Sequence, residues 1–160
     1  MKMERIRPQI VLVVGSRNSG KTAYLHLLKN RIQEQEECVG GVVSEAELRD
    51  GEKWRYWLRD IRTGKRLLLA THYDSSPGKL QVGRFRFEPE TFRWAEGVFR
   101  QSLDCDVLFL DEYGPLEARG EGFRHVLEFL LKNYRGILVI TLRPSLFEHL
   151  INEVLTQTPE

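Results

Sequence analysis

The 160-residue sequence has few cysteines, no long apolar run and almost no net charge, and each shortage excludes a class of protein. Its apolar runs fall far short of the ~18 residues that a membrane-spanning helix needs. Lys and Arg total 24 against 23 Asp and Glu, so no overall field attracts nucleic acid or an anionic membrane. Internal repeats and interdomain linkers are also absent, and we therefore expect one domain, residues 1–160, without a membrane span.

The two cysteines, Cys38 and Cys105, lie too far apart in the chain for a metal-ligand pair or a disulfide framework. We expect both to be buried or half-buried thiols that pack as small apolar side chains. Basic residues at the N-terminus precede an apolar run, but this run is too short for a secretory signal and ends at Gly15 without a cleavage site. The sequence therefore predicts a cytoplasmic, reduced protein.

Short apolar runs alternate with helical stripes along the chain. Residues 10–14 (IVLVV) are β-branched and unbroken, which is typical of a strand buried on both faces. The turn signal Asp50–Gly51 indicates a hairpin within about residues 50–70. This order predicts an α/β domain with a largely parallel sheet, covered on both sides, and an antiparallel insert. Other strands are expected near 39–47, 82–88, 106–112 and 136–142, a loop at 71–79, and helices after 22, 89, 123 and 144.

The segment GSRNSGKT, residues 15–22, matches the Walker A pattern G-x-x-x-x-G-K-T. Backbone N–H groups of such a loop wrap phosphates, Lys21 would reach the β and γ phosphates, and the Thr22 hydroxyl would bind Mg²⁺. Asn18 stands where many such loops have glycine, but Asn tolerates a left-handed backbone. Arg17 adds a charge that is either solvated or close to the phosphates. The predicted nucleotide-binding residues are Gly15, Ser16, Arg17, Asn18, Ser19, Gly20, Lys21 and Thr22.

The apolar run VLFL ends in two carboxylates, Asp111 and Glu112, which is the Walker B arrangement. Asp111 would hold Mg²⁺ together with Thr22. Glu112 would polarise an attacking water as a general base, so the predicted catalytic residues are Lys21 and Glu112. The guanine-reading motif Asn-Lys-x-Asp is absent, which argues against a GTPase of the Ras type. Thr141 or Arg143, at the end of the last strand, could contact the γ-phosphate or the water, or simply end the strand.

With both motifs placed, the sequence resembles the thermophile-type nucleoside-triphosphatase family, also called cancer-related nucleoside-triphosphatases. Residues 111–123 (DEYGPLEARGEGF) are similar to that family's D-E-[aliphatic]-G-x-[M/L]-E stretch, in which a Phe follows six residues after the last Glu. Glu117 and Phe123 hold these two positions. Residues 40–54 and 82–85 resemble two further family segments. The resemblance implies a three-layer, RecA-like P-loop NTPase fold and a Mg²⁺-dependent enzyme that hydrolyses ATP, GTP or other NTPs with loose base specificity. In the family, Pro and Gly usually stand at the positions of Arg17 and Asn18.

Two other functions stay open from the residues alone. A small-molecule P-loop kinase shares this length and these motifs, and the Arg-rich segment 59–66 resembles a kinase lid. A nucleotide-binding regulatory module is the other possibility. Residues 54–66 mix aromatic and basic side chains that could meet nucleic acid, although a packed hairpin with Tyr56 and Leu58 on one face is the favoured interpretation. A homo-oligomer sharing its site through Arg84, Arg119, Arg124 or Arg143, or an unidentified protein partner, is also compatible with the sequence.

Overall fold

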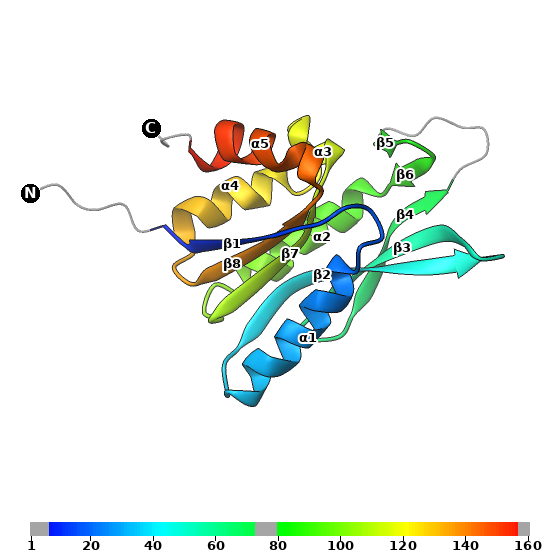
Figure 1. Ribbon diagram of the computed structural model, residues 1–160. Coiled ribbons are helices and arrows are strands. Elements are labelled where there is room, and N and C mark those ends of the chain that lie inside the picture. Colours follow the sequence, from blue (N-terminus) through cyan, green and yellow to red (C-terminus); the bar gives the residue numbers. More distant parts are fainter. Residues whose placement is uncertain (1–6, 73–79, 157–160) are drawn as a thin grey trace, which may run out of the picture.

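The computed structural model describes residues 7–72 and 80–156, which form an eight-stranded sheet with helices on both faces (Figure 1). The strands are β1 (Gln9–Val14), β2 (Val39–Arg49), β3 (Glu52–Asp60), β4 (Arg66–His72), β5 (Gln81–Val82), β6 (Phe85–Phe87), β7 (Val107–Tyr113) and β8 (Ile137–Leu142). The helices are α1 (Lys21–Glu34), α2 (Pro89–Arg100), α3 (Pro115–Ala118), α4 (Arg124–Asn133) and α5 (Phe147–Leu150), with the short turns η1 (Pro144–Leu146) and η2 (Ile151–Leu155).

The sheet is mixed, in the order β1-β8-β7-β2-β3-β4-β6-β5. Strands β1, β8, β7 and β2 pair in parallel, and the remaining pairs are antiparallel. The expectation of a mostly parallel sheet with a separate hairpin insert is therefore only half right. The start of β2 pairs with β7 and the rest of it with β3, because its 11 residues are long enough for both partners. The hairpin thus continues the same sheet.

Strand β1 lies at the edge of the sheet, and the prediction that it is buried on both faces is wrong. It pairs with β8 on one side, and Val11 and Val14 are 43% and 44% exposed. An apolar, β-branched run indicates that side chains pack on the faces of the sheet, but it does not indicate whether the strand is paired on both edges. The carboxyl end of β1, where the nucleotide-binding loop was predicted, therefore lies near an open edge.

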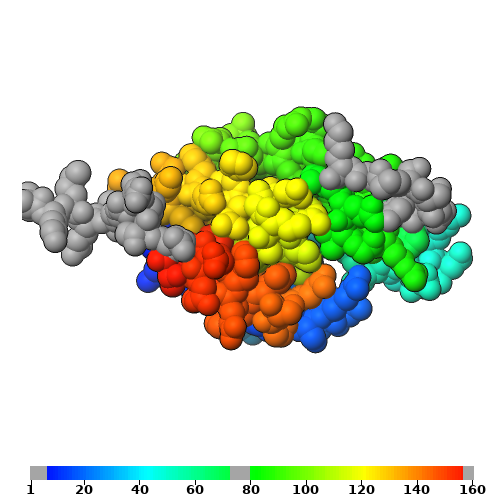
Figure 2. Space-filling model, turned by 90° about the horizontal axis from the view of Figure 1, so that it is seen from above, coloured from blue at the N-terminus to red at the C-terminus, as the bar shows by residue number. Residues whose placement is uncertain are grey.

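Two apolar cores hold the helices against the sheet. Helix α1 covers one face, where Leu25 packs with Val39, Val107 and Phe109. Helices α2, α4 and α5 cover the other face, and Figure 2 shows α4 (yellow) beside the C-terminal helices (orange to red). Helices thus pack on both faces of the sheet, and the predicted three-layer arrangement is confirmed in part. In the described ranges, no helix has the length and apolar character needed to cross a membrane.

Two further expectations need correction. The predicted strand at 82–88 is two short strands, β5 and β6, because the chain turns at Gly83, whose φ is +57°. Of the predicted loop at 71–79, residues 71 and 72 belong instead to β4, and residues 73–79 lie outside the described part of the chain. Tyr56 and Leu58 do pack together in the larger core, as expected for the hairpin.

Cys38 and Cys105 form a disulfide in the structure, which contradicts the prediction of two reduced thiols. Their Cα atoms lie 4.9 Å apart although 67 positions separate them in sequence. Parallel pairing of β2 with β7 brings them together, since the Cys38 carbonyl accepts hydrogen bonds from the Asp106 and Val107 amides at 3.1 Å. Sequence spacing does not reveal such a pairing, because it arises from the order of strands in the sheet.

Candidate functional site

The glycine loop, defined here as Gly15–Gly20, joins β1 to α1 (Figure 1). Its start is fixed by a hydrogen bond of 3.1 Å from the Gly15 amide to the Leu142 carbonyl at the end of β8. Asn18 has a φ of +62° and Gly20 a φ of +91°. The left-handed backbone expected at Asn18 is therefore confirmed, and an asparagine serves there in place of glycine.

Lys21 folds its side chain back over the glycine loop. Its Nζ donates hydrogen bonds to the Gly15 carbonyl at 2.7 Å and the Ser16 carbonyl at 3.0 Å. Helix α1 starts at the same residue, and the Tyr24 amide donates to the Gly20 carbonyl at 2.9 Å. The loop thus combines a flexible ammonium group with the free amides at the start of a 14-residue helix, an arrangement that attracts anions.

Asp111, at the carboxyl end of β7, is buried and accepts hydrogen bonds from three different elements. Thr22 Oγ1 of α1 donates to Oδ2 at 2.9 Å, and the Ser44 amide of β2 donates to the same oxygen at 3.0 Å. Thr141 Oγ1 of β8 donates to Oδ1 at 2.6 Å. These contacts fix the carboxylate directly beside the start of α1, as the paired motifs predict.

The pair of Thr22 and Asp111 fits Mg²⁺. Mg²⁺ prefers oxygen ligands and is bound by one or two carboxylates together with water and substrate phosphates. The Thr22 hydroxyl and the Asp111 carboxylate supply two such oxygens, 2.9 Å apart. In the described part of the chain, His, Cys, Asp and Glu form no group of three or more that could hold a metal without such help. A metal here would therefore depend on the phosphates for much of its coordination.

Glu112 differs sharply from its neighbour Asp111. It forms an ion pair with Arg143, whose Nε lies 3.4 Å from Oε1. Oε1 is buried and accepts no hydrogen bond from any described residue. Burial raises the pKa of Glu112 above its ordinary value of 4.5; the Arg143 charge opposes this shift, Asp111 adds to it and Lys21 opposes it. The carboxylate is therefore more basic than an exposed glutamate.

The turn after Glu112 is held by Glu117, a residue of the family-like stretch. Its carboxylate accepts hydrogen bonds from the Gly114 and Phe123 amides, both at 2.8 Å. Burial raises the pKa of Glu117 to about 7. Gly122 passes so close that an added Cβ would lie 2.0 Å from Glu117 Oε2. Glu117 therefore organises the backbone that follows the site, which accounts for the glutamate and for Gly122 in this segment.

Of the arginines that the sequence offers as charges for the site, Arg143 is the one placed beside Glu112. Arg119 instead contacts the Gln81 carbonyl and Glu121, and Arg124 contacts Glu128 and the Glu117 carbonyl. The sequence leaves the roles of Thr141 and Arg143 open. In the structure, Thr141 contacts Asp111 and Arg143 contacts Glu112.

Two site residues had no signal in the sequence. Ser44 contributes its backbone amide to Asp111, so its side-chain type carries no information. Lys53 donates from Nζ to Oδ1 of Asn18, and thus brings the β2–β3 hairpin against the glycine loop. Both contacts arise because β2 continues beyond Val42, its last pair with β7, which only the sheet topology shows.

Comparison with known proteins finds nucleoside-triphosphatases. A family model described as NTPase matches residues 10–158. The chain is 31% identical over 117 residues to the nucleoside-triphosphatase THEP1 of Methanopyrus kandleri, covering 72% of this chain and 63% of that protein. It is 24% identical over 168 residues to THEP1 of Methanocaldococcus jannaschii, covering 91% and 96%.

Solved structures show the same fold. A human cancer-related nucleoside triphosphatase superposes with a TM-score of 0.73 at 21% identity, over 91% of this chain and 84% of that one. THEP1 from Aquifex aeolicus superposes with a TM-score of 0.67 at 19% identity, over 92% and 84%. The matched family model spans nearly the whole described sequence, glycine loop and carboxylates included. The chain therefore belongs to the NTPase family, a family of nucleoside-triphosphatase enzymes.

Proposed function

We propose that this protein hydrolyses a nucleoside triphosphate to the diphosphate and inorganic phosphate, with Mg²⁺ and with loose preference for the base. The glycine loop and Lys21 bind the phosphates, Thr22 and Asp111 hold the metal, and Glu112 activates the water. Loose base preference is proposed on the resemblance to the thermophile-type nucleoside-triphosphatase family; the absence of the motif Asn-Lys-x-Asp argues only against guanine reading of the Ras type. Relatives named as nucleoside-triphosphatases support the reaction class.

The observation that carries this proposal is the contrast between Asp111 and Glu112. Both oxygens of Asp111 accept hydrogen bonds, so this carboxylate is suited to a fixed, ionised role beside a metal. Oε1 of Glu112 is buried and lies 3.4 Å from Arg143 Nε in an ion pair, outside hydrogen-bond geometry, and the pKa of Glu112 is raised. A carboxylate with raised basicity and an oxygen that is not fixed by a hydrogen bond is suited to act as a general base.

In the proposed step, Glu112 accepts a proton from the attacking water. Water gives a proton to the Glu112 carboxylate while its oxygen attacks the γ-phosphorus. The bond from that phosphorus to the β–γ bridging oxygen breaks, and the electron pair stays on the diphosphate. Lys21 stabilises the charge that moves onto the phosphate oxygens, and Arg143 keeps Glu112 in place. Mg²⁺, when bound, neutralises charge on the β and γ oxygens.

The segment 59–66 does not favour the kinase alternative. Arg59 contacts Glu45 and the Gly64 carbonyl, and Arg62 contacts the Gln101 carbonyl. The turn that holds them joins β3 to β4 beside Gly41, at the opposite end of β3 from the contact between Lys53 and the glycine loop. These arginines are therefore bound to other parts of the protein, away from the predicted phosphates.

Glu112→Gln tests the proposal. Removing a general base lowers the rate by about 10²- to 10⁴-fold, so phosphate release should fall by this factor. Affinity for a non-hydrolysable NTP analogue should change little, because the amide keeps the shape of the side chain. Phosphate release is measured with a panel of NTPs, with Mg²⁺ and with a chelator.

Glu128→Gln is the matched control, since Glu128 pairs with Arg124 on the surface of α4. It should turn over at the native rate. Undiminished phosphate release by Glu112→Gln would show that Glu112 is not the base. Detection of a phosphorylated acceptor with little free phosphate would show that the reaction is phosphoryl transfer and not hydrolysis.

A further inference from the structure

A cation from the β2–β3 hairpin lies against the glycine loop. Lys53 is the second residue of β3, and its Nζ donates a hydrogen bond to Oδ1 of Asn18, 35 positions earlier in the chain. The hairpin turns at Asp50 and Gly51, which have φ values of +52° and +79°. Strand β2 extends seven residues beyond its last pair with β7, Val42, and so carries this turn past the carboxyl ends of the parallel strands.

Lys53 lacks a carboxylate partner in the part of the chain that the structure describes. Its Nζ contacts the Asn18 amide and lies 5.6 Å from the centroid of the Tyr56 ring. Two other cations of the hairpin are paired with carboxylates, since Arg55 lies near Glu47 and Arg59 near Glu45. The residue as a whole is half-buried, whereas its hydrogen bond to Asn18 is exposed, so the ammonium group is open to an incoming anion and has no carboxylate to release.

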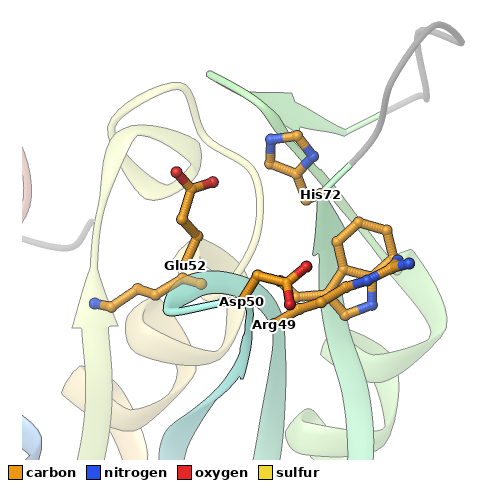
Figure 3. A pocket seen from close by; sticks show the side chains of 6 residues that line it. Arg49, Asp50, Glu52 and His72 are labelled. Atoms are coloured by element: carbon orange, nitrogen blue, oxygen red, sulfur yellow. The ribbon is translucent and has the colours of Figure 1, made fainter.

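The carboxylates of the hairpin turn lie near Lys53 but form no ion pair with it within the described residues. Asp50 and Glu52 line a hollow of about 350 Å³ together with Lys53 itself and with His72 on β4 (Figure 3). Arg49 covers the ring of Trp54, 4.6 Å from its centroid, at the edge of the same hollow. The acidic groups of the turn therefore leave the ammonium of Lys53 unpaired at the loop.

We propose that Lys53 contacts the terminal phosphate of a bound nucleoside triphosphate, as a cation that the hairpin supplies within the same chain. This inference rests on the proposed function of the glycine loop and adds a residue to it. Lys21 reaches the phosphates from the helix and Lys53 from the rim of the loop at Asn18. Two ammonium groups then stabilise the negative charge on the oxygens of the transferred phosphoryl group.

The proposal predicts that Lys53 distinguishes triphosphate from diphosphate. Lys53→Gln removes the charge and Lys53→Arg keeps it. Lys65→Gln is the control, because it removes an exposed charge from the turn between β3 and β4. A charge-assisted contact contributes about 1.5–3 kcal/mol, or about 10- to 100-fold in affinity. Lys53→Gln should weaken binding of a non-hydrolysable NTP analogue by about this factor and leave NDP binding unchanged. Lys53→Arg should bind largely like the native protein, and Lys65→Gln fully so.

Isothermal titration calorimetry with the analogue and with NDP provides this measurement, and it needs no turnover. Its result therefore stands apart from that of the hydrolysis experiment. In the turnover assay, Lys53→Gln should also lower kcat by about 10- to 100-fold. If Lys53→Gln weakens both nucleotides equally, or weakens neither, the proposal is wrong.

Asn18→Gly separates contact with phosphate from an effect through the loop. Glycine keeps the left-handed backbone at this position and removes the amide that Lys53 contacts. If Lys53 contacts the phosphate itself, Asn18→Gly keeps the preference for triphosphate over diphosphate. Loss of that preference in Asn18→Gly, to the extent seen in Lys53→Gln, would make Lys53 a positioning residue and overturn the proposal.

Discussion

Adjacent residues at the end of β7 have opposite surroundings. Asp111 is buried and pairs with Thr141 on β8, whereas Glu112 lies at an irregularity in the pairing of β7 with β8 and forms an ion pair with Arg143. Asp111 gains three donors there, and Glu112 gains one cation and a desolvated oxygen. Two carboxyl groups of similar chemistry thereby acquire the separate properties of a ligand and a base.

The raised pKa of Glu112 predicts the acid limb of the pH–rate profile. A general base acts only when ionised, so activity should fall as the pH drops through the pKa of Glu112, and the midpoint should lie above 4.5. Arg143 lowers that pKa, so Arg143→Gln should move the limb to higher pH. The measurement is kcat against pH at saturating NTP and Mg²⁺.

Arg135→Gln serves as the control for this shift, because Arg135 is exposed at the opposite end of β8. Its acid limb should coincide with that of the native protein. A limb that stays in place in Arg143→Gln would mean that another group sets it.

Part of this residue-scale picture follows from the sequence. The glycine loop, Lys21, Thr22 and the two carboxylates are predictable, because they occur in short motifs whose spacing the local backbone determines. The left-handed Asn18 is predictable for the same reason. The Ser44 amide and the Lys53 ammonium are not, because their contacts depend on where a distant strand lies.

Among the elements, β2 has the most demanding position, since it joins the parallel and antiparallel halves of the sheet. Gly41 lies opposite Phe109 on β7, with a φ of +90°. A Cβ added to it would lie 2.3 Å from the Phe109 carbonyl oxygen. Backbone atoms cannot yield as a side chain does, so glycine is required for β2 to approach β7.

Gly41→Ala should therefore destabilise the protein by more than about 3 kcal/mol or prevent folding, because steric overlap adds to backbone strain. Gly51→Ala provides a matched comparison, since Gly51 also has positive φ but has open space around its Cα. It should cost only about 1–2 kcal/mol. Urea unfolding followed by circular dichroism compares them, and equal losses would contradict the role assigned to the contact with Phe109.

The sequence predicts where helices and strands lie along the chain better than it predicts which strands lie side by side in the sheet. Apolar periodicity and turn residues locate the hairpin at Asp50–Gly51 and the helix that starts at Pro89. The edge position of β1 and the split of β2 between two partners were missed. Periodicity reflects the layers above and below a strand, whereas in-plane order depends on connections across the whole chain.

At the scale of the whole molecule, the disulfide ties the start of β2 to the turn before β7. It encloses the hairpin, β4 to β6 and helix α2 in one covalent loop. A cross-link over this separation restricts the unfolded chain and stabilises the fold by about 4 kcal/mol in the chain-entropy account.

Reduction should accordingly lower the free energy of unfolding by up to about 4 kcal/mol, measured by urea unfolding with and without a thiol reductant. The double variant Cys38→Ala/Cys105→Ala controls for direct effects of the reductant and should be insensitive to it. Identical stability of the native protein in both conditions would show that the cysteines are thiols in solution, as the sequence alone suggested.

The pairing of β1 with β8 also has a consequence for synthesis of the chain. Val14, immediately before the glycine loop, pairs with Leu142, near the other end of the described chain. At translation rates of about 5–20 residues per second, roughly 6 to 25 seconds separate the synthesis of these two residues. Until β8 emerges from the ribosome, β1 remains an apolar strand without a partner, exposed to chaperones and to other nascent chains. Strand β1 is translated before the other strands of the sheet but is thus among the last to take its place in it, so a truncated product that lacks β8 leaves the glycine loop without its anchor.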